Sequence, residues 1–126
     1  MQGLDIITAS HQGFKPLVNF GSWRVAFLNG SQSYEGKVID SLSRHLETDE
    51  VFVLVKGSCL LITAGNGDNP GEVTKTWMEP GVVYNVTKGA WHGHIVLPGT
   101  MVMIVENRDT GSNNSESRPV KEKISL

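Results

Sequence analysis

The stretch that decides the fold runs from Ser43 to Gly57 and reads S-R-H-L-E-T-D-E-V-F-V-L-V-K-G. A histidine and a carboxylate, His45 and Glu50, stand on either side of the polar segment Glu47-Thr48-Asp49. This spacing is enough to end one strand, turn and begin the next. We therefore expect both side chains to point the same way across a hairpin.

The second half of this stretch is an apolar strand. From Glu50 the sequence E-V-F-V-L-V is mostly β-branched or aromatic, and apolar residues occupy both faces of the expected strand, which is typical of a strand covered on both faces. A carboxylate at the start of such a strand needs a partner, because burying a lone charge is costly. The partner is either His45 or a metal ion.

A similar arrangement follows from Gly81 to His92, G-V-V-Y-N-V-T-K-G-A-W-H. It reads as a strand, a turn at Thr87-Lys88-Gly89, and a new strand that opens with Trp91, His92 and His94. Trp91 and His92 are adjacent in the expected strand, so their side chains point to opposite faces. Trp91 is therefore expected to pack outside any pocket that contains His92, or at a dimer interface.

These two stretches resemble the two motifs of the cupin superfamily, over residues 36 to 107. The first motif is matched, with its spacing intact, at His45, Glu50 and Gly57, and the second at Gly81, Gly89 and His92. Four motif positions differ, namely a leading histidine, an opening glycine, a proline and an asparagine, which are here Ser43, Lys37, Thr87 and Val96.

The resemblance implies a double-stranded β-helix, or jelly-roll barrel, with a divalent metal site. His45, Glu50 and His92 occupy three of the four positions that bind metal in the family, and such a set suits iron, manganese, zinc or nickel. His94 has the parity of His92 and is a candidate for the missing ligand or for a general base, with Glu50 as the second candidate catalytic group. The alternative is a barrel without metal, in which the three residues form a hydrogen-bonded cluster.

Strand parity suggests further pocket residues. Ser41 and Ser43 share a face with His45, and this small polar face is typical of a pocket. Tyr84 and Met103 are also candidates for the pocket lining, the alternative being that both are core residues. Arg24 alternates with Trp23 and Val25, and it either holds a substrate carboxylate inside the barrel or lies at the surface.

Composition excludes several classes of function. The chain has 126 residues, the length of one domain, and a net charge of −2, which gives no case for binding nucleic acid or an acidic membrane. Its single cysteine, Cys59, is expected to be a buried small hydrophobe. We find neither a long apolar run nor the pattern of a signal peptide, so the expectation is a cytoplasmic protein without membrane contact.

Short strands separated by turns predict an all-β fold for the whole chain. The expected organisation is one domain in three parts: an N-terminal arm and first strand at 1–35, the cupin barrel core at 36–107, and a polar C-terminal tail at 108–126. The resemblance and the apolar strands together favour a homodimer.

The sequence leaves three functions open. The first is a metal-dependent enzyme of dioxygenase, isomerase or lyase type that acts on a small polar or carboxylated metabolite. The second is a metal-free barrel that binds a small-molecule ligand without catalysis. The third is suggested by Gly89-Ala90-Trp91-His92, which is similar to a stretch of the ureidoglycolate lyases.

Overall fold

The structure is a computed structural model that describes residues 3–30 and 36–126. These residues form ten strands in two five-stranded sheets, with antiparallel pairing throughout both sheets. The first sheet has the order β1 (Gly13–Phe20), β2 (Trp23–Asn29), β9 (Met101–Asn107), β4 (Glu50–Lys56) and β7 (Val83–Val86). The second has the order β10 (Ser115–Ile124), β3 (Ile39–His45), β8 (His92–Val96), β5 (Cys59–Thr63) and β6 (Thr74–Trp77).

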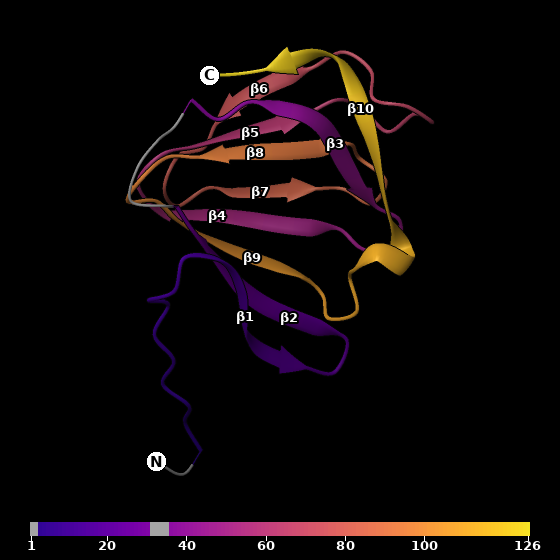
Figure 1. Ribbon diagram of the computed structural model, residues 1–126. Helices are drawn as coiled ribbons and strands as arrows, with labels where there is room; N and C mark the ends of the chain where they lie inside the picture. The colour runs from indigo at the N-terminus through magenta and orange to yellow at the C-terminus, as the bar shows by residue number, and fades with distance from the viewer. Residues whose placement is uncertain (1–2, 31–35) are drawn as a thin grey trace.

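The chain passes repeatedly from one sheet to the other (Figure 1). β2, β4, β7 and β9 lie in the first sheet, and β3, β5, β8 and β10 lie in the second. This alternation between two facing antiparallel sheets is the jelly-roll arrangement. The predicted all-β jelly roll is confirmed.

The main core fills the space between the sheets, because each sheet turns one apolar face inward. It contains buried residues from both sheets: Ala26, Phe52, Leu54, Cys59, Leu61, Met78, Val86, Val102 and Ile104. Cys59 is therefore a buried hydrophobe, as expected, and burial raises the pKa of its thiol to about 11.

A second apolar cluster covers the opposite face of the second sheet. Trp91 is its largest residue and is fully buried. The Arg44 guanidinium lies 4.6 Å from the centre of the indole ring, and the indole Nε1 donates to the Gly67 carbonyl at 2.9 Å. Trp91 thus packs outside the pocket, as its parity predicts, and it is covered by its own chain.

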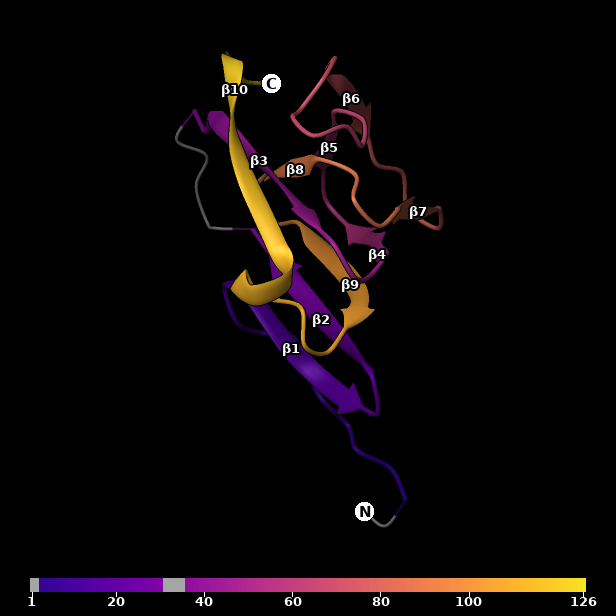
Figure 2. The same cartoon turned by 90° about the vertical axis from the view of Figure 1, so that its right-hand side faces the viewer.

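The C-terminal segment differs from the polar tail expected from the sequence. Ser115–Ile124 forms β10, which runs along β3 at the edge of the second sheet (Figure 2). Its register places Ser115 opposite His45 and Ser117 opposite Ser43. Edge strands commonly carry charged residues and proline, and this is why the segment does not look like a strand in the sequence.

The start of the chain extends away from the two sheets (Figure 1). Residues 4–10 form no regular element, and the Asn29 amide anchors this arm by donating to the carbonyls of Ala9 at 3.1 Å and His11 at 2.7 Å. In the part of the chain that the structure describes, no helix is long and apolar enough to cross a membrane.

Candidate metal centre

The short connection between β3 and β4 brings two of the candidate residues together. It is not the expected hairpin, because the two strands lie in different sheets and do not pair. His45 is the last residue of β3 and Glu50 is the first of β4, so the short connection passes from the second sheet to the first. His92 begins β8 and reaches the same point because it pairs with Ser43. Residues from both sequence motifs therefore meet at one end of the barrel.

Hydrogen bonds hold the two motifs against each other. The Asp49 carboxylate accepts from the Lys88 backbone at 2.8 Å and from the Asn85 amide at 3.1 Å. The Gly89 backbone N–H donates to the His45 carbonyl at 2.8 Å. Gly89 has a φ of +83°, a conformation that favours glycine, which gives a physical reason for the glycine at this motif position.

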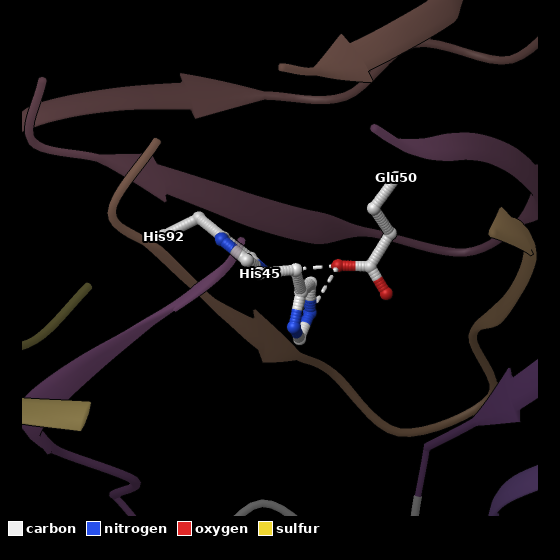
Figure 3. Close-up of side chains that lie close together, drawn as sticks. All are labelled: His45, Glu50 and His92. Atoms are coloured by element: carbon white, nitrogen blue, oxygen red, sulfur yellow. Dashed lines mark hydrogen bonds and ion pairs between the residues drawn. The ribbon is translucent and has the colours of Figure 1, made fainter. Parts of the chain in front are cut away.

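The side chains of His45 and His92 both contact the same carboxylate oxygen of Glu50 (Figure 3). Nε2 of His45 lies 3.2 Å from Glu50 Oε1, and Nε2 of His92 lies 2.9 Å from the same atom. One ligand atom from each of the three residues lies within 4.8 Å of the others. Glu50 and His92 are each only 6% exposed, so the cluster is largely shielded from solvent.

The other ring nitrogen of each histidine is already used. Nδ1 of His92 donates to the Ala90 carbonyl at 3.0 Å, and Nδ1 of His45 lies 2.8 Å from the Ser115 hydroxyl. In a neutral His92 this leaves a lone pair on Nε2, facing a carboxylate oxygen. Two such electron pairs require a cation between them, either a proton or a metal ion, so the site suits a divalent metal.

The pKa shifts of Glu50 and His92 are opposite in direction, and each favours the charged form of its group. Burial alone would raise the pKa of Glu50, but hydrogen bonds from His45, His92 and Glu106 outweigh it and hold the pKa below its usual value. For His92, burial acts to lower the pKa, and the neighbouring Glu50 carboxylate raises it above its usual value. The site therefore favours a negative Glu50 together with a positive charge beside it.

A second carboxyl group lies behind Glu50. Glu106, on β9, is 5% exposed, and its Oε2 accepts from Nε and Nη2 of Arg24 at 3.0 and 2.6 Å. Burial and the adjacent Glu50 raise the pKa of Glu106 to about 7. The Arg24 side chain is 16% exposed, and its guanidinium is engaged by Glu106.

His94 lies in the same cavity but outside the three-residue group. Its ring packs against Phe52, with 6.1 Å between ring centres, and burial lowers its pKa to about 4. Among the described residues, its buried Nδ1 has no hydrogen-bond partner. His94 thus lines the cavity beside the three-residue group, and its role as a ligand or general base stays a prediction.

The cavity has a volume of about 440 Å³ and opens between β3 and β8. These strands pair only at Ser43 and His92, and they diverge beyond that point (Figure 1). Ser41 and Ser43 line it as expected, although the Ser43 hydroxyl is 2.8 Å from that of Ser117. The lining is Lys37, Ile39, Asp40, Ser41, Ser43, His45, Glu50, His92, Gly93 and His94.

Two predicted pocket residues lie elsewhere. Met103 alternates with the buried Val102 and Ile104, so it points away from the barrel interior on the outer face of β9. Tyr84 packs against the main core, and its hydroxyl accepts from the Glu79 backbone at 2.9 Å. Neither Tyr84 nor Met103 is among the residues that line this cavity.

Sequence reasoning missed Glu106 and Ser115. Glu106 ends the apolar strand T-M-V-M-I-V-E, and the argument that a buried carboxylate needs a partner applied to it as it did to Glu50. Ser115 left no such signal, because its position beside His45 depends on the pairing of β10 with β3.

The comparisons with known proteins concern the fold. No family model matches the chain, and no curated protein matches it. A cupin 2 domain-containing protein from Halorhodospira halophila has 16% sequence identity and a TM-score of 0.57, with 96% of this chain and 75% of that chain covered. KdgF from Halomonas sp. has 18% identity and a TM-score of 0.56, with 76% and 79% covered.

A third solved structure is an RmlC-like cupin protein from Desulfovibrio desulfuricans, with 13% identity and a TM-score of 0.57. The alignment covers 85% of this chain and 96% of that chain. The protein is thus a jelly-roll barrel with a His-Glu-His cluster at one end. More specifically, it has the cupin fold.

Proposed function

We propose that His45, Glu50 and His92 bind a divalent metal ion. The observation that carries this proposal is the pair of Nε2 atoms, 3.2 and 2.9 Å from one Glu50 oxygen, with both Nδ1 atoms engaged elsewhere. Two imidazoles and one carboxylate leave coordination positions open, a set that suits iron, manganese, nickel or zinc.

We infer that the bound metal serves an enzyme acting on a small polar or carboxylated metabolite. A divalent ion would supply Lewis acidity or a site for oxygen or water. A cavity of about 440 Å³ accommodates a small metabolite. His94 would hydrogen-bond this molecule or exchange a proton with it through Nδ1, and Phe52 would keep the His94 ring in place.

A metal-free ligand-binding barrel is the second candidate. The observation that favours it is Ser43, which stands where the cupin motif has a histidine and whose hydroxyl is engaged with Ser117. Without metal, a proton between His92 and Glu50 would satisfy both groups as an ion pair. The cavity would then bind its ligand by hydrogen bonds alone.

Elemental analysis and calorimetric titration with Zn²⁺ or Mn²⁺ separate these candidates. We expect about one metal per chain in the wild type and its loss in His92→Ala with the fold retained by circular dichroism. His11→Ala is the matched control, because His11 contacts the Phe27 carbonyl outside the cluster. Ser43→His should bind the metal more tightly by adding a fourth ligand.

Full metal content in His92→Ala would refute the assignment of the ligands. A wild-type protein that takes up no metal would leave the metal-free barrel as the function. We also infer a cytoplasmic homodimer, whose association is tested below.

A further inference from the structure

A cationic side chain lies in the cavity apart from the metal-binding cluster. Lys37, just before β3, lines the cavity together with Ser41 and His94. It stands where the cupin motif has a glycine, so a long basic side chain here is a departure of this sequence. Within the described residues, Lys37 forms no ion pair.

Among the described residues that line this cavity, Lys37 is the only lysine or arginine. Lys37 is exposed to solvent and lines the same cavity as His45, Glu50 and His92.

The polar groups between Lys37 and the metal-binding cluster suit an oxygen-rich molecule. Ser41 and Ser43 supply hydroxyl groups, and the buried Nδ1 of His94 has no partner among the described residues. An unpaired buried polar atom is costly, and a bound hydrogen-bonding group would relieve that cost. In the described part of the chain, the cavity is therefore lined by one lysine, by polar groups and by two carboxylates, Asp40 and the Glu50 of the cluster.

We propose that Lys37 binds a carboxylate or phosphate group of the substrate in the cavity that it shares with the metal-binding cluster. This inference rests on the proposed function, because it places the other end of the substrate at His45, Glu50 and His92. It narrows the substrate class to anionic molecules with two polar ends. Lys37 is then a residue that determines specificity and takes no part in metal binding.

A neighbouring cleft is the alternative binding site for the anionic group of the substrate. It shares Asp40 and Ser41 with the cavity and is lined by Arg118, Lys121 and Lys123 of β10. It opens where the pairing of β10 with β3 is irregular, between Pro119 and Ile124. Lys37 is the better candidate because it lines the same cavity as the metal-binding cluster, whereas these three residues do not.

The test compares dicarboxylates with their monoamides in Zn²⁺-loaded protein. Malonate, succinate and glutarate are each titrated into the protein, and so is the monoamide of each acid. The monoamide keeps one carboxylate and has a neutral amide in place of the other. We expect the best dicarboxylate to bind wild type about tenfold more tightly than its monoamide, because the monoamide cannot form the charge-assisted hydrogen bond with Lys37. Lys37→Met should remove this preference and Lys37→Arg should restore it.

Controls separate this inference from the metal site. Lys37→Met should keep the wild-type zinc stoichiometry, and Lys15→Met, on β1 of the first sheet, should keep the preference. The inference is overturned if Lys37→Met retains the preference, or if Lys123→Met alone removes it. Should the wild type bind no metal, the proposed function fails, and the same titrations on metal-free protein still report the contribution of Lys37.

Discussion

Glu106 is a buried carboxyl group held between a positive and a negative partner. Arg24 neutralises its Oε2, whereas Glu50 faces it from β4 with a carboxylate held negative by the two histidines. Burial and this like charge raise the pKa of Glu106 to about 7. Near neutral pH the site therefore tends to keep a proton on Glu106, which can hydrogen-bond the carboxylate of Glu50.

The raised pKa of Glu106 makes stability depend on pH. The folded protein holds this proton up to about pH 7, whereas the unfolded chain releases it near the ordinary value of 4.5. The folded state thus binds more protons between these values, so stability falls as pH rises across this window. We expect the loss to be roughly 1–3 kcal/mol, since one pKa unit corresponds to about 1.4 kcal/mol.

Glu106→Gln should remove this dependence, because an amide neither charges nor loses its hydrogen bonds to Arg24. Urea unfolding in the presence of chelator, at pH 5 and pH 7.5, would measure the change. Glu122→Gln, at an exposed position of β10, should behave like wild type. Identical pH profiles for wild type and Glu106→Gln would show that Glu106 is already ionised at pH 5.

The residues of the site differ in how far the sequence reveals them. His45 and Glu50 flank one short connection between strands, so their meeting follows from local spacing, and the motif around Gly89 adds His92. Arg24 and Glu106 lie 82 residues apart, and their ion pair depends on the pairing of β2 with β9. Such contacts depend on which strands pair in the sheet, and a short stretch of sequence does not reveal this pairing.

At the level of elements, the connection between β4 and β5 depends on Gly57. It has a φ of +86°, and a Cβ added there would lie 2.5 Å from the Cα of Thr100. The Thr100 hydroxyl needs this close approach, because it accepts from the Ser58 N–H and donates to the Ser58 carbonyl, both at 2.9 Å. Because residue 57 has no side chain, the segments that contain Ser58 and Thr100 can approach closely enough to form these two hydrogen bonds.

Gly57→Ala should lower the free energy of unfolding by at least about 2 kcal/mol, from the backbone conformation and the steric clash together. Gly65→Ala is the matched control, because Gly65 has a similar φ of +72° with no atom within 4 Å of the added Cβ. It should cost only about 1 kcal/mol. Chemical denaturation measures both variants, and equal losses would mean that contact with Thr100 adds nothing.

The same contrast between local and distant information applies to whole strands. The apolar runs of β4, β5 and β9 could be predicted, because burial demands apolar residues along them. β10 could not, since S-E-S-R-P-V-K-E-K-I has no apolar run. Its place beside β3 comes from side-chain pairs such as Ser117 with Ser43 and Glu116 with Arg44, which alternate across two polar strands.

On the scale of the whole molecule, the outer face of the first sheet is apolar. Its central side chains are half-buried and alternate with residues of the main core: Val25, Phe27, Val51, Val53, Met103 and Val105. Val83, which pairs with Val53, is 65% exposed. The sequence predicted that β4 is covered on both faces, yet within one chain its outer face is only partly covered.

A second copy of the chain is the partner that this face fits. The six central side chains carry no charge, so an occupant needs an equally uncharged apolar surface. The same face on another copy provides one, and a two-fold axis through β4 and β9 would bring the two faces together. We therefore expect a homodimer in which the outer faces of the two first sheets pack against each other.

Val53→Asp tests this dimer, because it places a charge at the centre of the proposed interface. Light scattering after size-exclusion chromatography should give twice the chain mass for wild type and the single chain mass for Val53→Asp. The half-buried position makes the variant tolerable in a monomer, and circular dichroism checks that its fold is kept. Trp77→Asp, at a residue 51% exposed on β6 of the other sheet, should remain dimeric. A monomeric wild type, or a dimer unaffected by Val53→Asp, would exclude this face as the interface.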